Sequence, residues 1–136
     1  IHICGKDKID ASLVGTAGYV QFDYVKKELS SLLALADVVI SRAGANAICE
    51  LLALKKPNIL IPLSANASRG DQILNSKSFQ ASGYSVVIEE EQLTNETLLE
   101  AVSSVYENRE KYVNAMKHSD LADPIGTIMG LIEEVQ

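Results

Sequence analysis

The sequence predicts an α/β fold, a Rossmann-like parallel sheet with helices on both faces. Segments rich in β-branched residues alternate along the chain with segments whose apolar residues recur at helical spacing. The clearest example is residues 37–62, where a β-branched run, a glycine turn, a helix and a second apolar run follow one another. Continuous apolar strands are typical of parallel sheets that are buried on both faces. We therefore expect this segment to be a right-handed strand–helix–strand unit.

The remaining elements are expected in order along the chain. Lys55, Lys56 and Pro57 should end the central helix, because positive charge stabilises the carboxyl end of a helix and proline prevents its continuation. Thr94 and Thr97 resemble the capped start of another helix. Residues 63–70 are small and polar, and we expect a loop without a packed element. Other strands are predicted at 1–4, 19–22 and 84–88, and other helices at 29–36, 71–82, 94–105, 109–118 and 123–135.

Length and composition indicate one globular domain of 136 residues, with 47% hydrophobic and 22% charged residues. The net charge is −6 and the basic residues are scattered, which argues against nucleic acid as a partner. No apolar run approaches the roughly 20 residues of a membrane helix. We expect Cys4 and Cys49 to be buried, reduced thiols. Because the chain begins at Ile1, inside a predicted strand, we expect it to be a fragment of a longer protein.

The start of the central helix is a candidate anion site. The backbone N–H groups of Ala45, Asn46 and Ala47 should point outward there, where the helix dipole favours negative charge such as a diphosphate. Glu50 is one turn further on and shares a face with Asn46. A carboxylate in that place can accept hydrogen bonds from the two hydroxyls of a ribose. The alternative is a solvated glutamate beside an ordinary glycine turn, since neither feature is specific by itself.

A second candidate pair, Asp71 and Gln72, stands at the predicted start of the helix 71–82. Its carboxylate and amide groups suit sugar hydroxyls. The alternative is an aspartate that caps the helix and a glutamine in solvent. Ligands bind at the carboxyl ends of parallel strands, so the loops that begin at Ser41 and Ser64 should meet in one crevice. Arg42 could face a phosphate there, although a surface arginine is more common.

The sequence shows no clear pattern of metal ligands or of a general base. No Asp-x-Asp pair is present to hold a metal on a diphosphate, and the two histidines have no partners at ligand spacing. No serine lies in a nucleophile-elbow pattern. The chain therefore offers a binding crevice and no credible general base.

Three motifs together resemble the nucleotide-sugar half of the MurG family of bacterial N-acetylglucosaminyltransferases: SRAGANAICE at 41–50, the segment 57–62, and SRGDQILN at 68–75. The resemblance covers nearly the whole chain and looks like the branch from Gram-positive bacteria. It implies the C-terminal domain of a GT-B glycosyltransferase that completes the lipid-linked peptidoglycan precursor. Such an enzyme transfers the sugar with inversion of configuration at the sugar carbon. It requires no metal or cofactor and takes UDP-GlcNAc as its donor.

The resemblance also implies roles for individual residues. Glu50 would hold the ribose hydroxyls, the amides of 45–47 the diphosphate, and Asp71 and Gln72 the GlcNAc hydroxyls, while the backbone near Val25 would read the uracil edge. Many relatives have two glutamines where this chain has Asp71 and Gln72. The expected substrate-binding residues are Val25, Ser41, Arg42, Gly44, Ala45, Asn46, Ala47, Glu50, Asp71 and Gln72.

The same resemblance places the acceptor site, the membrane-contacting surface and the candidate base in an N-terminal domain that residues 1–136 lack. We therefore expect no catalytic residue in this chain, and no transfer by the chain alone. The full-length enzyme would be cytoplasmic and peripheral on the cytoplasmic face of the cell membrane, where it meets the lipid-linked muramoyl-pentapeptide acceptor. Two alternatives stay open: a nucleotide-sugar-binding subunit of a split glycosyltransferase, and another GT-B enzyme such as a glycolipid synthase or a nucleotide-sugar epimerase.

Overall fold

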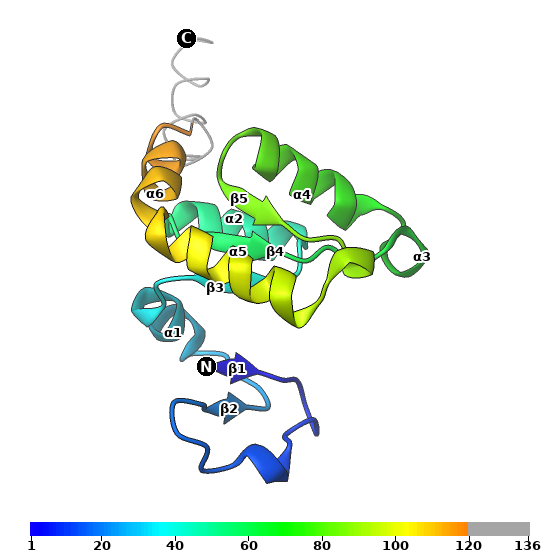
Figure 1. Cartoon of the computed structure of the whole chain (residues 1–136), viewed down its shortest axis with the longest axis vertical. Coiled ribbons are helices and arrows are strands. Elements are labelled where there is room, and N and C mark those ends of the chain that lie inside the picture. Colours follow the sequence, from blue (N-terminus) through cyan, green and yellow to red (C-terminus); the bar gives the residue numbers. More distant parts are fainter. Residues whose placement is uncertain (120–136) are drawn as a thin grey trace, which may run out of the picture. The chain divides into compact units, whose positions relative to one another are not determined.

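The computed structural model describes residues 1–119, and it divides the chain into two compact units, residues 1–35 and the part that begins at Ala36 (Figure 1). All strand pairs in both units are parallel in the described residues. The helix predicted at 123–135 lies outside the described residues. None of the helices within 1–119 is long and apolar enough to cross a membrane.

The first unit is a small pair of parallel strands with one 3₁₀ helix and one α-helix. β1 pairs with β2 in a register that sets His2 beside Gln21. The strands predicted at 1–4 and 19–22 are confirmed, although only two residues of each are strand. The elements of this unit are β1 (His2–Ile3), the 3₁₀ helix η1 (Ala11–Leu13), β2 (Gln21–Phe22) and α1 (Leu29–Leu35).

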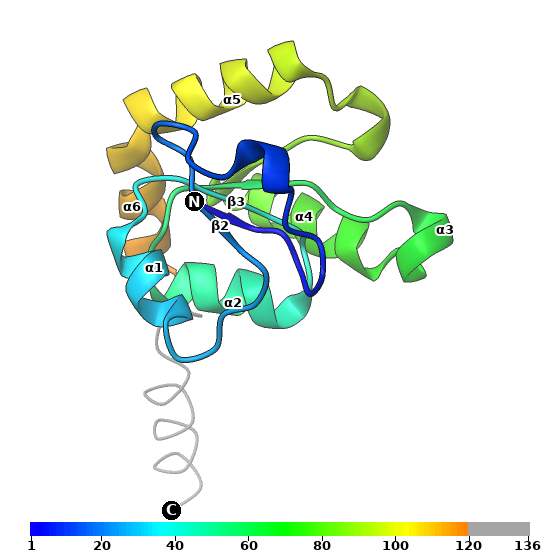
Figure 2. The same ribbon diagram turned by 90° about the horizontal axis from the view of Figure 1, so that it is seen from below.

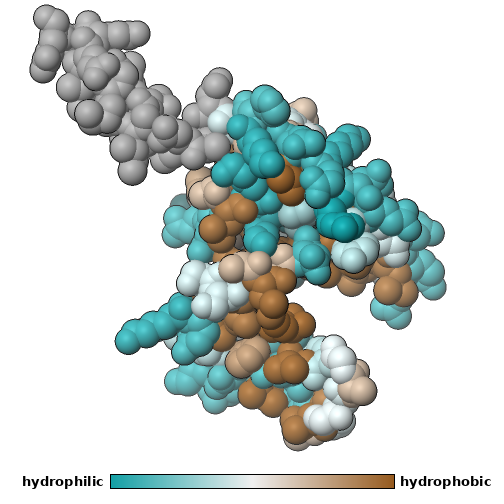
Figure 3. All heavy atoms as spheres, turned by 90° about the vertical axis from the view of Figure 1, so that its left-hand side faces the viewer, coloured by the Kyte–Doolittle hydropathy of each residue, from teal (hydrophilic) through white to brown (hydrophobic). Residues whose placement is uncertain are grey.

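Apolar side chains remain at the surface of this first unit (Figure 3). Val14 and Val20 are more than half exposed, and no residue of 1–35 is buried. The buried core of the described chain therefore lies in the second unit.

The second unit holds a three-stranded parallel sheet in the order β3-β4-β5. In the register of this sheet, Ile40 is beside Ile59 and Ile59 is beside Val86. The elements are β3 (Val39–Ser41), α2 (Ala45–Ala53), β4 (Asn58–Leu60), α3 (Ala65–Ser68), α4 (Asp71–Ala81), β5 (Ser85–Val87), the 3₁₀ helix η2 (Glu90–Gln92), α5 (Asn95–Glu107) and α6 (Arg109–Lys117).

Helices cover both faces of this sheet, as predicted. Figure 2 shows α2 and α5 on opposite sides of the strands. The core on the α5 side contains Ile59, Ile61, Ile88 and Val105, all of which are buried. Burial of such aliphatic side chains contributes about 1.5–3 kcal/mol each relative to full exposure, so this layer is a main source of stability.

The carboxyl end of α2 explains how the chain turns into β4. Lys55 has a positive φ of 52°, and its N–H donates to the carbonyl of Leu52 while that of Lys56 donates to the carbonyl of Leu51. This pair of bonds is a Schellman motif with lysine where glycine is usual. Lys56 Nζ also donates to the carbonyl of Ala36 at 3.0 Å. The predicted end of this helix at Lys55 and Lys56 is confirmed.

The start of α5 is also confirmed. The N–H of Thr97 donates to Thr94 Oγ1 at 3.1 Å, and the N–H of Thr94 donates to Thr97 Oγ1 at 2.9 Å. These reciprocal bonds form a capping box, which satisfies two N–H groups that a helix start leaves without partners.

Two sequence predictions are wrong. Residues 63–70 contain the short helix α3, whose start is held by the hydroxyl of Ser68 donating to the carbonyls of Leu63 and Ser64. Cys49 is exposed, because it lies on the outer face of α2 opposite the buried Ile48, Leu51 and Leu52. Cys4 is half-buried.

Candidate functional site

The amino end of α2 is an open helix start at the carboxyl end of β3. Gly44 is its N-cap and provides no capping side chain. The first helical hydrogen bond runs from the N–H of Ile48 to the carbonyl of Gly44 at 3.1 Å. Within the described part of the chain, the N–H groups of Ala45, Asn46 and Ala47 have no hydrogen-bond partner. Three unpaired amides at the positive end of a helix dipole can receive an anion.

Glu50 lies one turn along the same helix, on its exposed face. The buried face of α2 is formed by Ile48, Leu51 and Leu52, so Asn46 and Glu50 face away from the core. Neither side chain has a hydrogen-bond or ion-pair partner in residues 1–119. Both are therefore free to contact a ligand that lies along the outside of the first two turns.

Gln72 joins the loops that leave β3 and β4. Its Oε1 accepts the N–H of Ala43 at 3.3 Å and the N–H of Leu63 at 3.0 Å. Asn75, one turn further along α4, donates from Nδ2 to the carbonyl of Ala43 at 3.0 Å. The backbone of the residue before Gly44 is thus held on both its N–H and its carbonyl. Half-buried side chains from α4 fix the turn that opens α2.

The free end of the Gln72 amide faces the helix start. Its Nε2 would be 4.0 Å from a Cβ on Gly44, and in the described residues that nitrogen makes no hydrogen bond. Gln72 therefore has a donor available to a ligand even though its oxygen is used within the fold. The alternative of a glutamine in solvent is not what the structure shows.

Arg42 and Glu90 connect all three loops at this end of the sheet. Arg42 Nη1 donates to Glu90 Oε1 at 2.7 Å and to the carbonyl of Ile61 at 3.2 Å. Glu90 Oε2 accepts the N–H of Ser64 at 3.2 Å. Two hydrogen bonds lower the pKa of the Glu90 carboxyl. The one from Arg42 has the larger effect and the one from the Ser64 N–H the smaller. Arg42 is thus engaged within the protein in this structure.

The structure also shows where the other predicted site residues lie. Asp71 is exposed in the first turn of α4, and the N-cap there is Gly70, so Asp71 does not cap the helix. Ser41 ends β3 and its hydroxyl donates to the carbonyl of Arg42 at 2.9 Å. Val25 is half-buried in the first unit, between β2 and α1. The structure therefore brings Arg42, Gly44 and Gln72 together with the α2 start.

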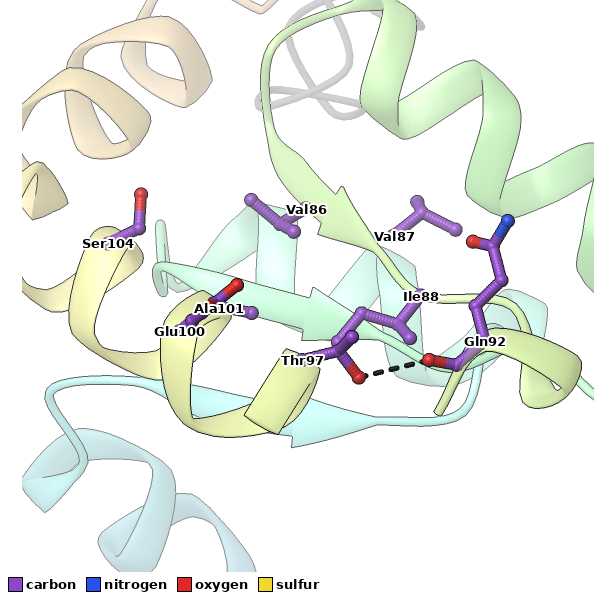
Figure 4. A pocket seen from close by; sticks show the side chains of 8 residues that line it. All are labelled: Val86, Val87, Ile88, Gln92, Thr97, Glu100, Ala101 and Ser104. Atoms are coloured by element: carbon purple, nitrogen blue, oxygen red, sulfur yellow. Dashed lines mark hydrogen bonds between the residues drawn. The ribbon is translucent and has the colours of Figure 1, made fainter. Parts of the chain in front are cut away.

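Two hollows occur elsewhere on the second unit. One, of about 360 Å³, lies between β5 and α5 and is lined by Val86, Ile88 and Ala101, with the hydroxyl of Thr97 donating to the carbonyl of Gln92 at its rim (Figure 4). The other, of about 320 Å³, is lined partly by Ser64, Lys77 and Glu90. Neither of these two hollows is lined by a predicted site residue.

No three side chains of His, Cys, Asp or Glu within 1–119 come together in a way that could hold a metal ion.

The parallel sheet with helices on both faces and the open start of α2 define a Rossmann-like α/β domain of the kind found in GT-B glycosyltransferases. Residues 1–126 match the family model described as glycosyltransferase family 28 C-terminal domain. The chain belongs to this family. A crystal structure of Acinetobacter baumannii MurG has the same fold, with a TM-score of 0.66 and 20% identity; the match covers 85% of this chain and 33% of that one.

Sequence relatives agree with the structural match. A Lachnoclostridium phytofermentans protein named UDP-N-acetylglucosamine--N-acetylmuramyl-(pentapeptide) pyrophosphoryl-undecaprenol N-acetylglucosamine transferase is 63% identical over 136 residues, which are 100% of this chain and 38% of the relative. The Lachnospira eligens protein of the same name is 58% identical over 134 residues, 98% of this chain and 38% of the relative. The chain thus spans 38% of the length of these relatives. The predicted resemblance to MurG and the predicted fold are confirmed.

Sequence reasoning did not assign Glu90 or Asn75 to the site. Glu90 is one of three consecutive glutamates, and nothing in the sequence distinguishes it from its neighbours. Its partner Arg42 is 48 residues away. Asn75 carries a weak signal, since it lies one turn after Asp71 on a helix that begins at the same sheet edge.

Proposed function

We propose that this chain is the donor-binding half of an N-acetylglucosaminyltransferase. The whole enzyme would transfer GlcNAc from UDP-GlcNAc to undecaprenyl-diphospho-muramoylpentapeptide, with inversion at the sugar carbon, and so convert lipid I to lipid II in peptidoglycan biosynthesis. The observation that carries the proposal is the 63% identity, over the whole chain, to a relative with that transferase name. The open start of α2 supports it, because a sugar diphosphate needs such an anion site.

The diphosphate is assigned to the first turn of α2. The three unpaired amides of residues 45–47 would donate to its oxygens, and Gly44, without a side chain, allows close approach. Ser41 and Arg42 lie in the turn that leads to this helix. Glu50, free on the outer face one turn further on, would accept hydrogen bonds from the ribose hydroxyls.

The two ends of the donor are assigned to other elements. The carboxylate of Asp71 would accept from GlcNAc hydroxyls, while Gln72 would donate from its free Nε2. The backbone near Val25 would read the uracil edge. The acceptor site, the general base and the contact with the cytoplasmic face of the membrane would belong to other parts of the whole protein, so no catalytic residue is proposed in this chain.

Binding of UDP to this chain should not require a divalent metal. Backbone amides at a helix start neutralise a diphosphate without a cation, and the proposed site has no cluster of carboxylates to hold one. Isothermal calorimetry with UDP should give the same affinity with a chelator as with magnesium. CDP is the matched control ligand and should bind more weakly, since it differs only in the base edge.

Two results would contradict this proposal in different ways. Loss of UDP binding with the chelator, restored by magnesium, would replace the amide site with a metal site. Absence of UDP binding under both conditions would overturn the donor-binding function itself.

Replacing Ala45 with proline should weaken UDP binding about tenfold, since one charge-assisted hydrogen bond is lost. Proline is favoured at the first position of a helix, and Gly44 already has the extended φ of −66° and ψ of 146° that a residue before proline prefers. The substitution therefore removes one amide donor and leaves the helix intact. Calorimetry with UDP measures the effect, and the melting temperature checks the fold.

Asn95→Pro is the matched control for this substitution. Asn95 is the first residue of α5, after the N-cap Thr94, and the capping-box bonds do not use its N–H. This variant should bind UDP as the wild type does. An equal loss of affinity in both variants would show that proline acts through the fold and would remove the support for an amide site.

A further inference from the structure

One carboxylate links the three loops that leave the strands of the second sheet. Glu90, in the loop after β5, uses Oε1 on Arg42 from the loop after β3, at 2.7 Å. It uses Oε2 on the N–H of Ser64 from the loop after β4, at 3.2 Å. Arg42 Nη1 completes the connection by donating to the carbonyl of Ile61 at 3.2 Å. We call this set of four residues the loop network.

The loop network complements the contacts made by Gln72. Gln72 accepts from the N–H groups of Ala43 and Leu63, and the loop network holds the residues next to each of them, Arg42 and Ser64. The two loops are thus fixed from the α4 side by an amide and from the η2 side by a carboxylate. Since Gly44 has no side chain, the position of the α2 start depends on these neighbours.

The partial exposure of the Arg42–Glu90 ion pair determines how much it contributes to stability. The side chain of Arg42 is 50% exposed and that of Glu90 is 32% exposed. Partly exposed ion pairs contribute modestly to stability, so breaking this pair should leave the fold intact. The geometry of the turn is more sensitive, because loops that bind ligands rely on such side-chain contacts for their conformation.

We propose that Glu90 is a positioning residue of the donor site. It holds the guanidinium of Arg42 and the backbone of Ser64 so that the first turn of α2 is set for the diphosphate, and it keeps Arg42 on the sheet edge as part of the turn. This inference rests on the proposed donor-binding function. It differs from the sequence-based expectation for Arg42, in which the guanidinium would itself face the phosphate.

The test compares Glu90→Gln with Glu91→Gln. Each variant loses one negative charge near the proposed anion site, but Glu91 is exposed and makes no hydrogen bond through its side chain in the described residues. Glu90→Gln removes the ion pair with Arg42 and should weaken UDP binding roughly three- to fivefold, the upper range for one partly exposed pair. Glu91→Gln should change it by less than about twofold.

Arg42→Gln separates positioning from direct contact. If Glu90 positions the turn through Arg42, then Arg42→Gln and Glu90→Gln weaken binding alike, and the double variant is no weaker than the weaker single variant because the two residues act as a unit. If Arg42 contacts the phosphate directly and Glu90 competes for it, Glu90→Gln tightens binding while Arg42→Gln weakens it. That second pattern overturns the proposal.

A ligand-free measurement distinguishes this inference from the proposed function. In Glu90→Ala, the amide proton resonance of Ser64 should shift because its carboxylate acceptor is gone, while the resonance should stay in place in Glu91→Ala. Wild-type protein that fails to bind UDP overturns the proposed function, and the positioning role falls with it, even if the Ser64 resonance shifts. Wild-type protein that binds UDP, with Glu90→Gln binding as tightly as Glu91→Gln, overturns the positioning role alone.

Discussion

Replacing Ile59 with alanine should destabilise the chain by about 2–5 kcal/mol, the range for removal of a buried isoleucine side chain. Ile59 lies at the centre of β4, the middle strand of the second sheet, and it is 0% exposed. It packs within the core on the α5 side together with Ile61, Ile88 and Val105. Urea unfolding followed by circular dichroism measures the loss as a change in the free energy of unfolding.

Ile40→Ala is the matched control, since Ile40 is the register partner of Ile59 on the neighbouring strand. Its side chain is 47% exposed. The same substitution should therefore cost about 1 kcal/mol or less there, because only part of the side chain leaves an apolar environment. Equal losses at the two positions would contradict the assignment of the core to the centre of this sheet.

The order of strands and helices in the described residues could be predicted because local sequence determines it. The β-branched residues 38–40 favour a strand, although β3 is only partly buried and Ile40 is 47% exposed, so the burial on both faces that the pattern suggested is not found. The bonds at Lys55 and Thr94 are made with residues close in sequence. The short helix α3 was missed because four residues carry too little periodicity to be recognised. The exposure of Cys49 was missed because the position of a residue on a helix decides burial more than its type does.

The candidate site could be predicted only in part. Gly44 and the residues that follow it are a local pattern, so the open helix start was visible in the sequence. Gln72 and Glu90 contact residues that are 9 to 48 positions away in the sequence. Such contacts form only when the chain folds, so the local sequence pattern does not reveal them. Arg42 illustrates the limit: its charge suggested a phosphate, whereas its partner in the structure is a carboxylate.

Glu50→Gln should weaken UDP binding roughly tenfold to a hundredfold. If the Glu50 carboxylate accepts hydrogen bonds from both ribose hydroxyls, the amide keeps the size of the side chain but loses the charge and one of the two acceptors. Hydrogen bonds to charged groups contribute on the order of 1.5–3 kcal/mol, which gives this range of affinity. Because Glu50 is exposed and has no partner within residues 1–119, the free energy of unfolding should change by no more than about 0.5 kcal/mol.

The sharper measurement titrates UDP and 2′-deoxy-UDP against both proteins, with melting temperatures recorded beside the affinities. The deoxy ligand should bind the wild type more weakly than UDP does, and Glu50→Gln should reduce that binding by less than it reduces UDP binding, because one of the two hydroxyls that pair with the carboxylate is already absent. The two losses are then not additive, as expected for groups in direct contact. Equal losses for the two ligands would show that Glu50 acts elsewhere on the donor. A large fall in melting temperature would instead make Glu50 a structural residue of α2, and the ribose would need another acceptor near the same helix start.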